Sequence, residues 1–245
     1  MSIRMSRRSL AAAASAYPRP LWLIDLDNTL HDASWTLMGE INRRMTRYIV
    51  DQLGVDEAEA SALRQTYWHR YGATLLGMVR HQGTDPHDFL AKTHPAPDEL
   101  VAFLKFERGL ASRIGRLQGE RWLLTNAPRV YTHRLLESMR IGRLFDRLIC
   151  IEDMRAMGQL RPKPSTWLWR RLIQIAHRAP SQITLIDDSA ENLRGAHRAG
   201  MRTARVWVSK TLRDRTRAQL RPVSIRRPHY VHHQVNSLSA LVRLP

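Results

Sequence analysis

The sequence predicts an α/β fold in which a doubly wound parallel sheet carries an all-helical segment after its first strand. From Arg121 onward, short apolar runs alternate with helical patterns, which is typical of βαβ units in a parallel sheet. The stretch from Ser34 to about Arg108, by contrast, contains no convincing strand and reads as successive helices. With 245 residues, of which 43% are hydrophobic, the chain can bury a full core.

The first half of the chain supplies one strand and the helical segment. Leu21 to Ile24 is an apolar, strand-like run that ends in acidic residues. Four helices are expected next: one in which Trp35, Ile41, Met45 and Ile49 recur before Gly54, then Glu57 to Tyr71, Ala73 to His81, and a short helix that starts at Asp85-Pro86. Glycine is a common helix stop and proline is favoured in a first turn, so the punctuation agrees with this division.

The second half supplies the rest of a Rossmann-like sheet. Strands are expected at Trp122–Leu124, Leu148–Ile151, Ile183–Ile186 and Thr203–Val208, and helices at Val130–Met139, Ser165–His177 and Ala190–Ala199. A basic surface connection over Lys210–Arg227, a small strand at Tyr230–His232 and a terminal helix at Ser237–Val242 complete the pattern. We therefore divide the chain into an extension at 1–20, an α/β core at 21–34 and 109–245, and a helical unit at 35–108.

The charge of the chain is high but unevenly distributed. The net charge is +17 and the pI is about 11.3, values that raise nucleic acid as a partner. Residues 1–19 carry four arginines without an acid, and residues 202–227 carry nine Lys or Arg against one Asp, which leaves about +5 elsewhere. A nucleic-acid partner is therefore not favoured, and without an apolar run near the roughly 20 residues of a membrane span no membrane partner is expected.

The compartment is inferred from the N-terminus and the cysteine count. The first twenty residues are rich in Arg, Ser and Ala and contain no acid, as in a mitochondrial transit peptide, although a short bacterial extension has the same composition. Because Ala and Arg richness runs through the whole chain, we favour a cytoplasmic protein. Cys150 is the one cysteine, which excludes a disulfide framework and a cysteine-based zinc site, and it is expected to be buried.

Four short motifs carry the candidate chemistry. They are Asp25-Leu26-Asp27-Asn28-Thr29-Leu30, Thr125-Asn126, Arg161-Pro162-Lys163-Pro164 and Asp187-Asp188-Ser189. Three of them end or closely follow expected strands, so they should meet at the carboxyl edge of the sheet, where open α/β folds bind ligands. Taken singly, each motif is more often a helix cap or a solvated loop. The ordered set of four favours a site for a phosphate and a divalent metal.

The residue types suggest a role for each member of the set. Carboxylates that end buried strands repel one another unless a hard cation offsets the charge, and Mg²⁺ takes carboxylate, phosphate and water oxygens. We expect Asp25 and Asp187 as ligands, with Asp188 either a third ligand or beside one. Ionised Asp25 is a competent nucleophile toward phosphorus, and Asp27 can exchange a proton with the leaving oxygen and with water. Thr125 and Lys163 can bind and neutralise the phosphate.

These residues resemble the motifs of the haloacid dehalogenase superfamily in its phosphatase branch, over about Leu21 to Val208. The resemblance implies an α-helical cap domain at the insertion and the cofactor Mg²⁺. It implies Asp25 as nucleophile, Asp27 as general acid/base, and Thr125, Asn126 and Lys163 at the phosphate. The metal would be held by Asp25, Asp187, Asp188 and the backbone carbonyl of Asp27. True dehalogenases of the superfamily lack the second Asp, so Asp27 implies phosphate-ester hydrolysis.

The substrate is suggested by a narrower resemblance. Asp-Asn-Thr-Leu-His, the Tyr71-Gly72-Ala73-Thr74-Leu75 segment and Ile186-Asp187-Asp188-Ser189 are similar to the pyrimidine 5′-nucleotidase group. A small phosphorylated substrate, a nucleoside monophosphate such as UMP or CMP, is the expected partner, with specificity residues Tyr71, Thr74 and His81. Tyr67 and Trp68 are more typical of a packed core. Phosphoglycolate or sugar phosphates remain alternatives, as does a nucleic-acid-binding protein built on a catalytic scaffold.

Overall fold

The structure is a computed structural model of the chain. It describes residues 19–33, 37–96, 99–100, 104, 106, 108–206 and 227–235. Residues 1–18 of the expected extension at 1–20, most of the basic connection and the helix at Ser237–Val242 lie outside these residues, as does Trp35.

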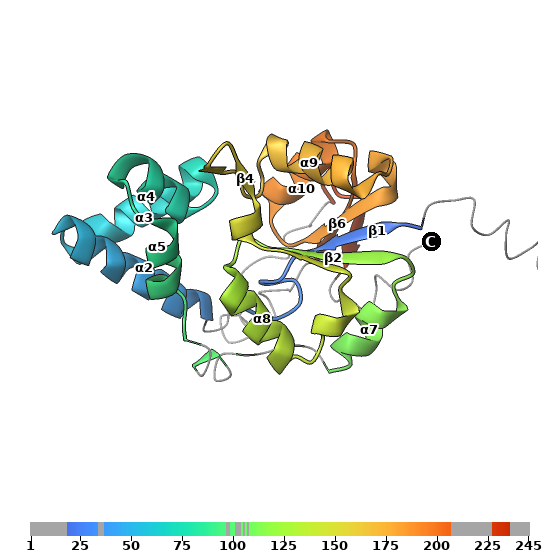
Figure 1. Cartoon of the computed structure of the whole chain (residues 1–245), viewed down its shortest axis with the longest axis horizontal. Coiled ribbons are helices and arrows are strands. Elements are labelled where there is room, and N and C mark those ends of the chain that lie inside the picture. The colour runs from blue at the N-terminus through green and yellow to red at the C-terminus, as the bar shows by residue number, and fades with distance from the viewer. Residues whose placement is uncertain are drawn as a thin grey trace, which may run out of the picture.

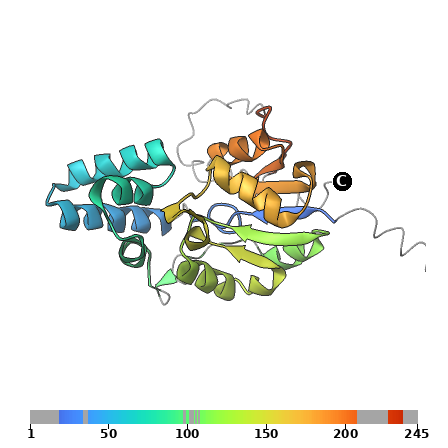
Figure 2. The same ribbon diagram turned by 45° about the horizontal axis from the view of Figure 1, so that its top comes forward.

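The centre of the molecule is a six-stranded sheet in the order β3-β2-β1-β6-β7-β8, and every pairing in it is parallel. Its strands are β1 (Leu21–Ile24), β2 (Glu120–Leu124), β3 (Arg147–Ile149), β6 (Ile183–Asp187), β7 (Arg202–Val206) and β8 (His233–Val235). Helices cover both faces (Figures 1 and 2). This arrangement confirms the doubly wound α/β fold.

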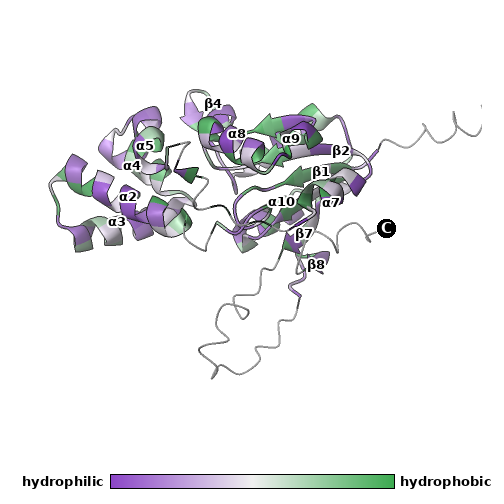
Figure 3. Ribbon diagram, turned by 90° about the horizontal axis from the view of Figure 1, so that it is seen from below, coloured by the Kyte–Doolittle hydropathy of each residue, from purple (hydrophilic) through white to green (hydrophobic). Residues whose placement is uncertain are grey.

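Alternation along the central strand explains why both faces of the sheet are covered. Leu21 and Leu23 of β1 pack into a cluster with α9 (Thr166–Ala176) and α10 (Ala190–Arg198), whereas Ile24 packs into a second cluster with α7 (Leu110–Arg116) and α8 (Arg129–Ser138). Successive side chains of a strand point to opposite faces, so an uninterrupted apolar strand needs a cover on each side. Figure 3 shows the hydrophobic character of β1 against the mixed hydropathy of the outer helices.

The insertion after β1 is helical and lies to one side of the sheet, at the left in Figure 1. It contains α2 (Leu37–Leu53), α3 (Glu57–Tyr71), α4 (Thr74–Gln82) and α5 (Pro86–Thr93). The Asp56 side chain accepts a hydrogen bond from the N–H of Glu59 at the start of α3, and Gly72 ends that helix at φ 80°. Tyr48, Tyr67, Met78 and Phe89 belong to a third hydrophobic cluster, which also includes Ile151 from the turn after β3. We refer to α2–α5 as the helical insertion.

Four local features differ from the sequence prediction. Helix α7 and the hairpin β4 (Arg155–Ala156) and β5 (Gln159–Leu160) were not expected, because such short elements give little periodic signal. The strand predicted at Leu148–Ile151 stops at Ile149, and a 3₁₀ turn begins at Ile151. The strand predicted at Tyr230–His232 lies instead at His233–Val235, because Thr203 accepts the N–H of His232 and donates to the carbonyl of Tyr230, holding a turn there.

Candidate active site

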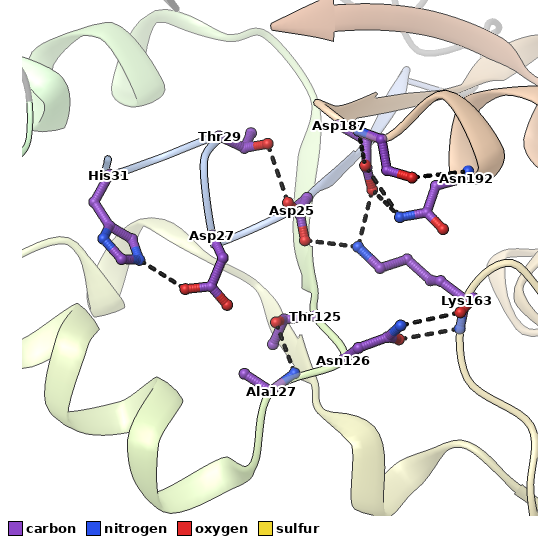
Figure 4. A network of polar contacts seen from close by, with 11 residues as sticks. Asp25, Asp27, Thr29, His31, Thr125, Asn126, Ala127, Lys163, Asp187 and Asn192 are labelled. Carbon is purple, nitrogen blue, oxygen red and sulfur yellow. Dashed lines mark hydrogen bonds and ion pairs between the residues drawn. The ribbon is translucent and has the colours of Figure 1, made fainter. Parts of the chain in front are cut away.

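The carboxyl ends of neighbouring strands gather the candidate residues at one edge of the sheet, as expected (Figure 4). Asp25 follows β1 and its N–H donates to the carbonyl of Ile186, while Asp187 is the last residue of β6. Thr125 follows β2, and its N–H donates to the carbonyl of Ile149. Lys163 arrives from the loop between β5 and α9.

Lys163 connects the two acidic strand ends. Its Nζ lies 2.6 Å from Oδ1 of Asp25 and 2.9 Å from Oδ2 of Asp187, and the residue is only 2% exposed. Burial alone would lower the pKa of Lys163, but the charges of Asp187 and Asp25 raise it above its usual value. The ammonium is therefore charged throughout the neutral range and neutralises part of the acidic cluster.

Asn126 holds the backbone of that lysine. Its Nδ2 donates to the carbonyl oxygen of Lys163, and its Oδ1 accepts from the N–H of Lys163, both at 3.0 Å. The Asn126 side chain thus supports the backbone of Lys163.

Thr125 lies at the bottom of the same edge and is 1% exposed. Its Oγ1 accepts a hydrogen bond of 3.0 Å from the N–H of Ala127. A hydroxyl that accepts from the backbone still has its own proton to donate, so Thr125 can donate to a group in the cavity that it lines.

The acidic residues at this edge carry more negative charge than Lys163 can offset. Burial raises the pKa of Asp25 well above its usual value; the Lys163 ammonium opposes this, and the charges of Asp187 and Asp188 add to it. Burial and then the charge of Asp187 raise the pKa of Asp188 to about 7. Asp25, Asp187 and Asp188 each place one carboxylate oxygen within 4.8 Å of the others. Three carboxylates around one lysine fit a hard divalent cation such as Mg²⁺.

The two adjacent aspartates differ in their surroundings. Oδ2 of Asp187 accepts from Lys163, Oδ1 accepts from the N–H of Ser189 at 2.8 Å, and the amide of Asn192 donates to both oxygens. Asp187 is completely buried, whereas Asp188 is partly exposed and lines the cavity. Asp187 is thus engaged by Lys163, Ser189 and Asn192. Asp188 faces the cavity.

Asp27 has a separate set of partners. Its Oδ1 accepts hydrogen bonds from Nε2 of His31 at 2.9 Å and from the hydroxyl of Tyr131 at 2.6 Å. Burial alone would raise the pKa of Asp27, but the hydrogen bonds from His31 and Tyr131 lower it overall. Its side chain remains 25% exposed and lines the cavity beside Asp25.

A cavity of about 780 Å³ separates this edge from the helical insertion. Its far wall includes Asn42, Arg64, Trp68, Tyr71, Thr74 and His94. Of the expected specificity residues, Tyr71 and Thr74 line the cavity, although the Thr74 hydroxyl donates to the carbonyl of Arg64. His81 does not line it. Its Nε2 lies 2.6 Å from the Tyr71 hydroxyl, so His81 contacts the cavity only through Tyr71.

Several residues at the site were not singled out from the sequence. The Thr29 hydroxyl donates to Oδ2 of Asp25 at 3.1 Å, and Asn192 and His31 have the contacts described above. Thr29 and His31 lie in the segment after Asp25 and Asp27, four residues from Asp25 and from Asp27 respectively, but no role of their own was predicted for them. Trp68 was taken for a core residue, but it is 54% exposed at the cavity wall. Tyr131 has no local signal, because 104 residues separate it from Asp27.

Comparison with solved structures places the chain in a known class of α/β fold. A HAD phosphatase from Thermococcus onnurineus matches with a TM-score of 0.59 and 14% identity, over 91% of this chain and 95% of the other. CbbY from Rhodobacter sphaeroides, in complex with phosphate, gives 0.57 and 18% over 91% and 96%. L-2-haloacid dehalogenase from Xanthobacter autotrophicus gives 0.53 and 16% over 91% and 97%. At these identities the likeness concerns the fold.

The family is established by sequence. Residues 21–200 match the profile of the haloacid dehalogenase-like hydrolases, and the chain belongs to that family. Phosphate metabolism protein 8 of Saccharomyces cerevisiae is 24% identical over 75% of this chain and 60% of its own length. A phosphoglycolate phosphatase of Pseudomonas putida is 27% identical over 74% and 66%. The chain thus spans about two thirds of the curated relatives it matches. In the described part of the chain, no helix is long and apolar enough to cross a membrane.

Proposed function

We propose that this protein is a Mg²⁺-dependent phosphomonoester hydrolase that acts through an aspartyl phosphate on Asp25. The observation that carries the proposal is the meeting of Asp25, Asp27, Lys163 and Asp188 around one cavity. The names of the relatives, phosphatases among them, support the same class of reaction.

In the first step, a carboxylate oxygen of Asp25 forms a bond to phosphorus while the bond from phosphorus to the ester oxygen breaks. Asp27 gives its proton to that departing oxygen, so the alcohol leaves neutral. In the second step, Asp27 takes a proton from water, whose oxygen attacks phosphorus and releases phosphate and the free Asp25 carboxylate. Thr125, Lys163 and the N–H of Asn126 would hold the phosphoryl oxygens during both steps.

The contacts around the acidic pair refine the expected metal ligands. We assign Asp25, Asp188 and the backbone carbonyl of Asp27 to the cation, and we assign Asp187 to the orientation of Lys163. This reverses the sequence-based preference for Asp187 over Asp188, because the oxygens of Asp187 already accept from Lys163, Ser189 and Asn192. When bound, Mg²⁺ supplies positive charge for the phosphoryl oxygens.

For the substrate, we propose a nucleoside monophosphate, best represented by the pyrimidine 5′-nucleotides UMP and CMP. A cavity of about 780 Å³ is within the ~300–1,000 Å³ typical of sites for drug-sized ligands, and is roomy for a two-carbon ester. Trp68 and Tyr71 at its wall offer aromatic faces for a base, and Asn42 and Arg64 offer polar groups. Phosphoglycolate is the second candidate, favoured by the similarity to phosphoglycolate phosphatases of Pseudomonas.

Phosphate release from UMP, CMP, purine nucleotides, sugar phosphates and phosphoglycolate, with Mg²⁺ and with EDTA, tests the proposal. We expect metal-dependent turnover that is highest for UMP and CMP and that is lost in Asp25→Asn. Preference for phosphoglycolate would keep the reaction and change the substrate. No release from any ester, together with salt-dependent binding of DNA or RNA, would replace the proposal by the nucleic-acid-binding alternative.

A further inference from the structure

We propose that His31 and Tyr131 are positioning residues for the proton transfer at Asp27: both donate to Oδ1, which turns Oδ2 toward the cavity as the oxygen that exchanges the proton. This inference rests on the proposed phosphatase reaction, in which Asp27 is the general acid/base.

The turn after β1 brings His31 back to Asp27. Asn28 adopts the left-handed conformation at φ 60°, and the N–H groups of Thr29 and Leu30 both donate to the carbonyl of Leu26. A backbone bridge then pairs Asp27 with His31. The imidazole is therefore carried by a closed loop, not by a long flexible segment.

The imidazole of His31 can act toward Asp27 only as a donor. Its side chain is completely buried, and a carboxylate oxygen at 2.9 Å can only accept, so Nε2 carries a proton. Nδ1 is buried and has no hydrogen-bond partner within the described part of the chain. An N–H at Nδ1 would be left unsatisfied, so the arrangement favours the tautomer with its proton on Nε2.

Tyr131 approaches the same oxygen from a distant part of the chain. It lies on α8, is 3% exposed, and donates to Oδ1 of Asp27 at 2.6 Å. Burial, and then the charge of Asp27, raise the pKa of Tyr131 well above its usual value, so its hydroxyl keeps the proton it donates. Because two donors reach Oδ1 from two sides, the carboxylate cannot rotate without losing both hydrogen bonds.

The helical insertion contacts this arrangement through His94. The His94 ring follows α5, lies 5.4 Å from the Tyr131 ring in an edge-on arrangement of 71°, and lines the cavity. Nδ1 of His94 lies 3.1 Å from the carbonyl of Leu90. Burial lowers the pKa of His94 to about 4, so the ring that packs on Tyr131 is neutral in the neutral range. The ring of Tyr131 is thus fixed from the insertion side while its hydroxyl binds Asp27.

The proposal predicts a dependence on the leaving group that a purely structural role would not give. General acid catalysis matters most when the departing oxygen is basic and least when it is a good leaving group. For Tyr131→Phe, we expect kcat/KM to fall by roughly 10- to 100-fold with phenyl phosphate, a part of the ~10²–10⁴-fold typical of general acid/base catalysis. With 4-nitrophenyl phosphate the loss should be about 3-fold or less, because that leaving group needs little protonation.

Matched variants separate positioning from folding. His31→Leu removes the donor and should give the same leaving-group dependence, whereas His31→Gln returns an N–H near the place of Nε2 and should restore most of kcat/KM. Tyr48→Phe is the control, because Tyr48 also donates to an aspartate, Asp88 at 2.8 Å, but within the helical insertion. Tyr48→Phe should lose equally little kcat/KM with both esters. Equal losses for both esters in Tyr131→Phe, at an unchanged Tm, would overturn the proposal.

A measurement that needs no turnover tests the hydrogen bond between His31 and Asp27 independently of the proposed function. In the wild-type protein, nitrogen-15 NMR should show the His31 proton on Nε2, with a downfield proton resonance that disappears in His31→Gln and moves in Asp27→Asn. If no ester is hydrolysed but the resonance behaves in this way, the proposed reaction fails while the arrangement of donors stands. A His31 proton on Nδ1, or a resonance that ignores Asp27→Asn, would overturn the positioning of Asp27 whatever the activity.

Discussion

Nζ of Lys163 lies 2.6 Å from Oδ1 of Asp25, although 138 residues separate them in sequence. The same ammonium also binds Asp187, and Asp188 is the next residue. One positive charge thus serves a cluster with three carboxylates, two of which have raised pKa values. The site is electrostatically incomplete by itself, so the groups that suit it for a cation and a phosphate also reduce the stability of the free protein.

Substitutions of this pair should therefore affect stability in opposite directions. Asp25→Asn removes a carboxylate whose ionisation is costly, and we expect the free energy of unfolding without Mg²⁺ at pH 8 to rise on the order of 1 kcal/mol or more, while hydrolysis is lost. Lys163→Met leaves Asp25 and Asp187 buried without their cation and should lower the free energy of unfolding by about 3–5 kcal/mol. Urea unfolding measures both. Destabilisation by Asp25→Asn would contradict the excess of negative charge in the cluster.

Asp188 predicts how stability depends on pH. Its pKa is about 7 in the folded protein against an ordinary value of 3.8, so between about pH 4 and pH 7 the folded state holds a proton that the unfolded chain has lost. The contribution of Asp188 to the free energy of unfolding should therefore fall as the pH rises through this window. His94 acts in the opposite sense, since its pKa falls from 6.5 to about 4 and its contribution is lost as the pH falls.

The difference between wild type and Asp188→Asn cancels the contribution of His94. We expect the variant to gain Tm relative to wild type as the pH rises from 4 to 8 in EDTA. Because Mg²⁺ needs the ionised carboxylate, it should raise the Tm of wild type more at pH 8 than at pH 5, and should raise that of Asp188→Asn little at either pH. Calorimetry at pH 5 and pH 8 measures the Tm of both proteins with and without Mg²⁺. An equal Mg²⁺ effect in both proteins would remove Asp188 from the ligands.

The close packing of two helices in the insertion gives a third prediction. A Cβ on Gly77 of α4 would lie 2.1 Å from Cγ of Tyr67 on α3, which no small adjustment can relieve. Gly77→Ala should therefore destabilise the insertion by about 1–3 kcal/mol, the typical cost of overpacking. Gly39→Ala on α2 is the control, because a Cβ there meets nothing within 4 Å and should add about 0.5–1 kcal/mol of stability. The midpoint of the loss of helical signal on heating can be compared for Gly77→Ala and Gly39→Ala. Equal midpoints would contradict the close packing at Gly77.

The sheet and the acidic edge follow from the sequence because a parallel sheet places every strand end on one side. Asp25, Thr125 and Asp187 end or follow apolar runs, so their meeting needs only the strand order. Lys163 has no strand before it, and its place depends on the side chain of Asn126, which a local pattern does not reveal. For the same reason Asn126 was assigned to the phosphate from its position beside Thr125.

The partners of Asp27 lie further from what sequence patterns can reveal. His31 reaches Asp27 because Asn28 adopts a left-handed conformation, which asparagine tolerates but does not require. Tyr131 is one of several apolar positions on α8, and only the packing of α8 against the sheet directs its hydroxyl to Asp27. Trp68 has the spacing of a core residue in α3, yet the insertion's core is closed by other side chains and leaves it at the cavity.

Contact between the helical insertion and the loop that carries Lys163 and Pro164 gives the last prediction. Gly72 has φ 80°, and a Cβ there would lie 3.1 Å from Cδ of Pro164 and 3.6 Å from the carbonyl oxygen of Lys163. Gly83, at φ 64°, ends the next helix and has nothing within 4 Å of such a Cβ. Alanine at either position introduces the same backbone strain, about 1–2 kcal/mol, but only at Gly72 does it press on the residue beside Lys163.

We therefore expect Gly72→Ala and Gly83→Ala to lower the free energy of unfolding by similar amounts, while kcat/KM for phosphate release falls about 10-fold or more in Gly72→Ala alone, because small misplacements of a catalytic group are costly. Because both variants carry the same backbone strain, the difference between their kcat/KM values reports the contact with Pro164. If both variants keep the wild-type kcat/KM, the position of Lys163 does not depend on the insertion. If both lose it equally, the cause is strain in the insertion and not the contact at Gly72.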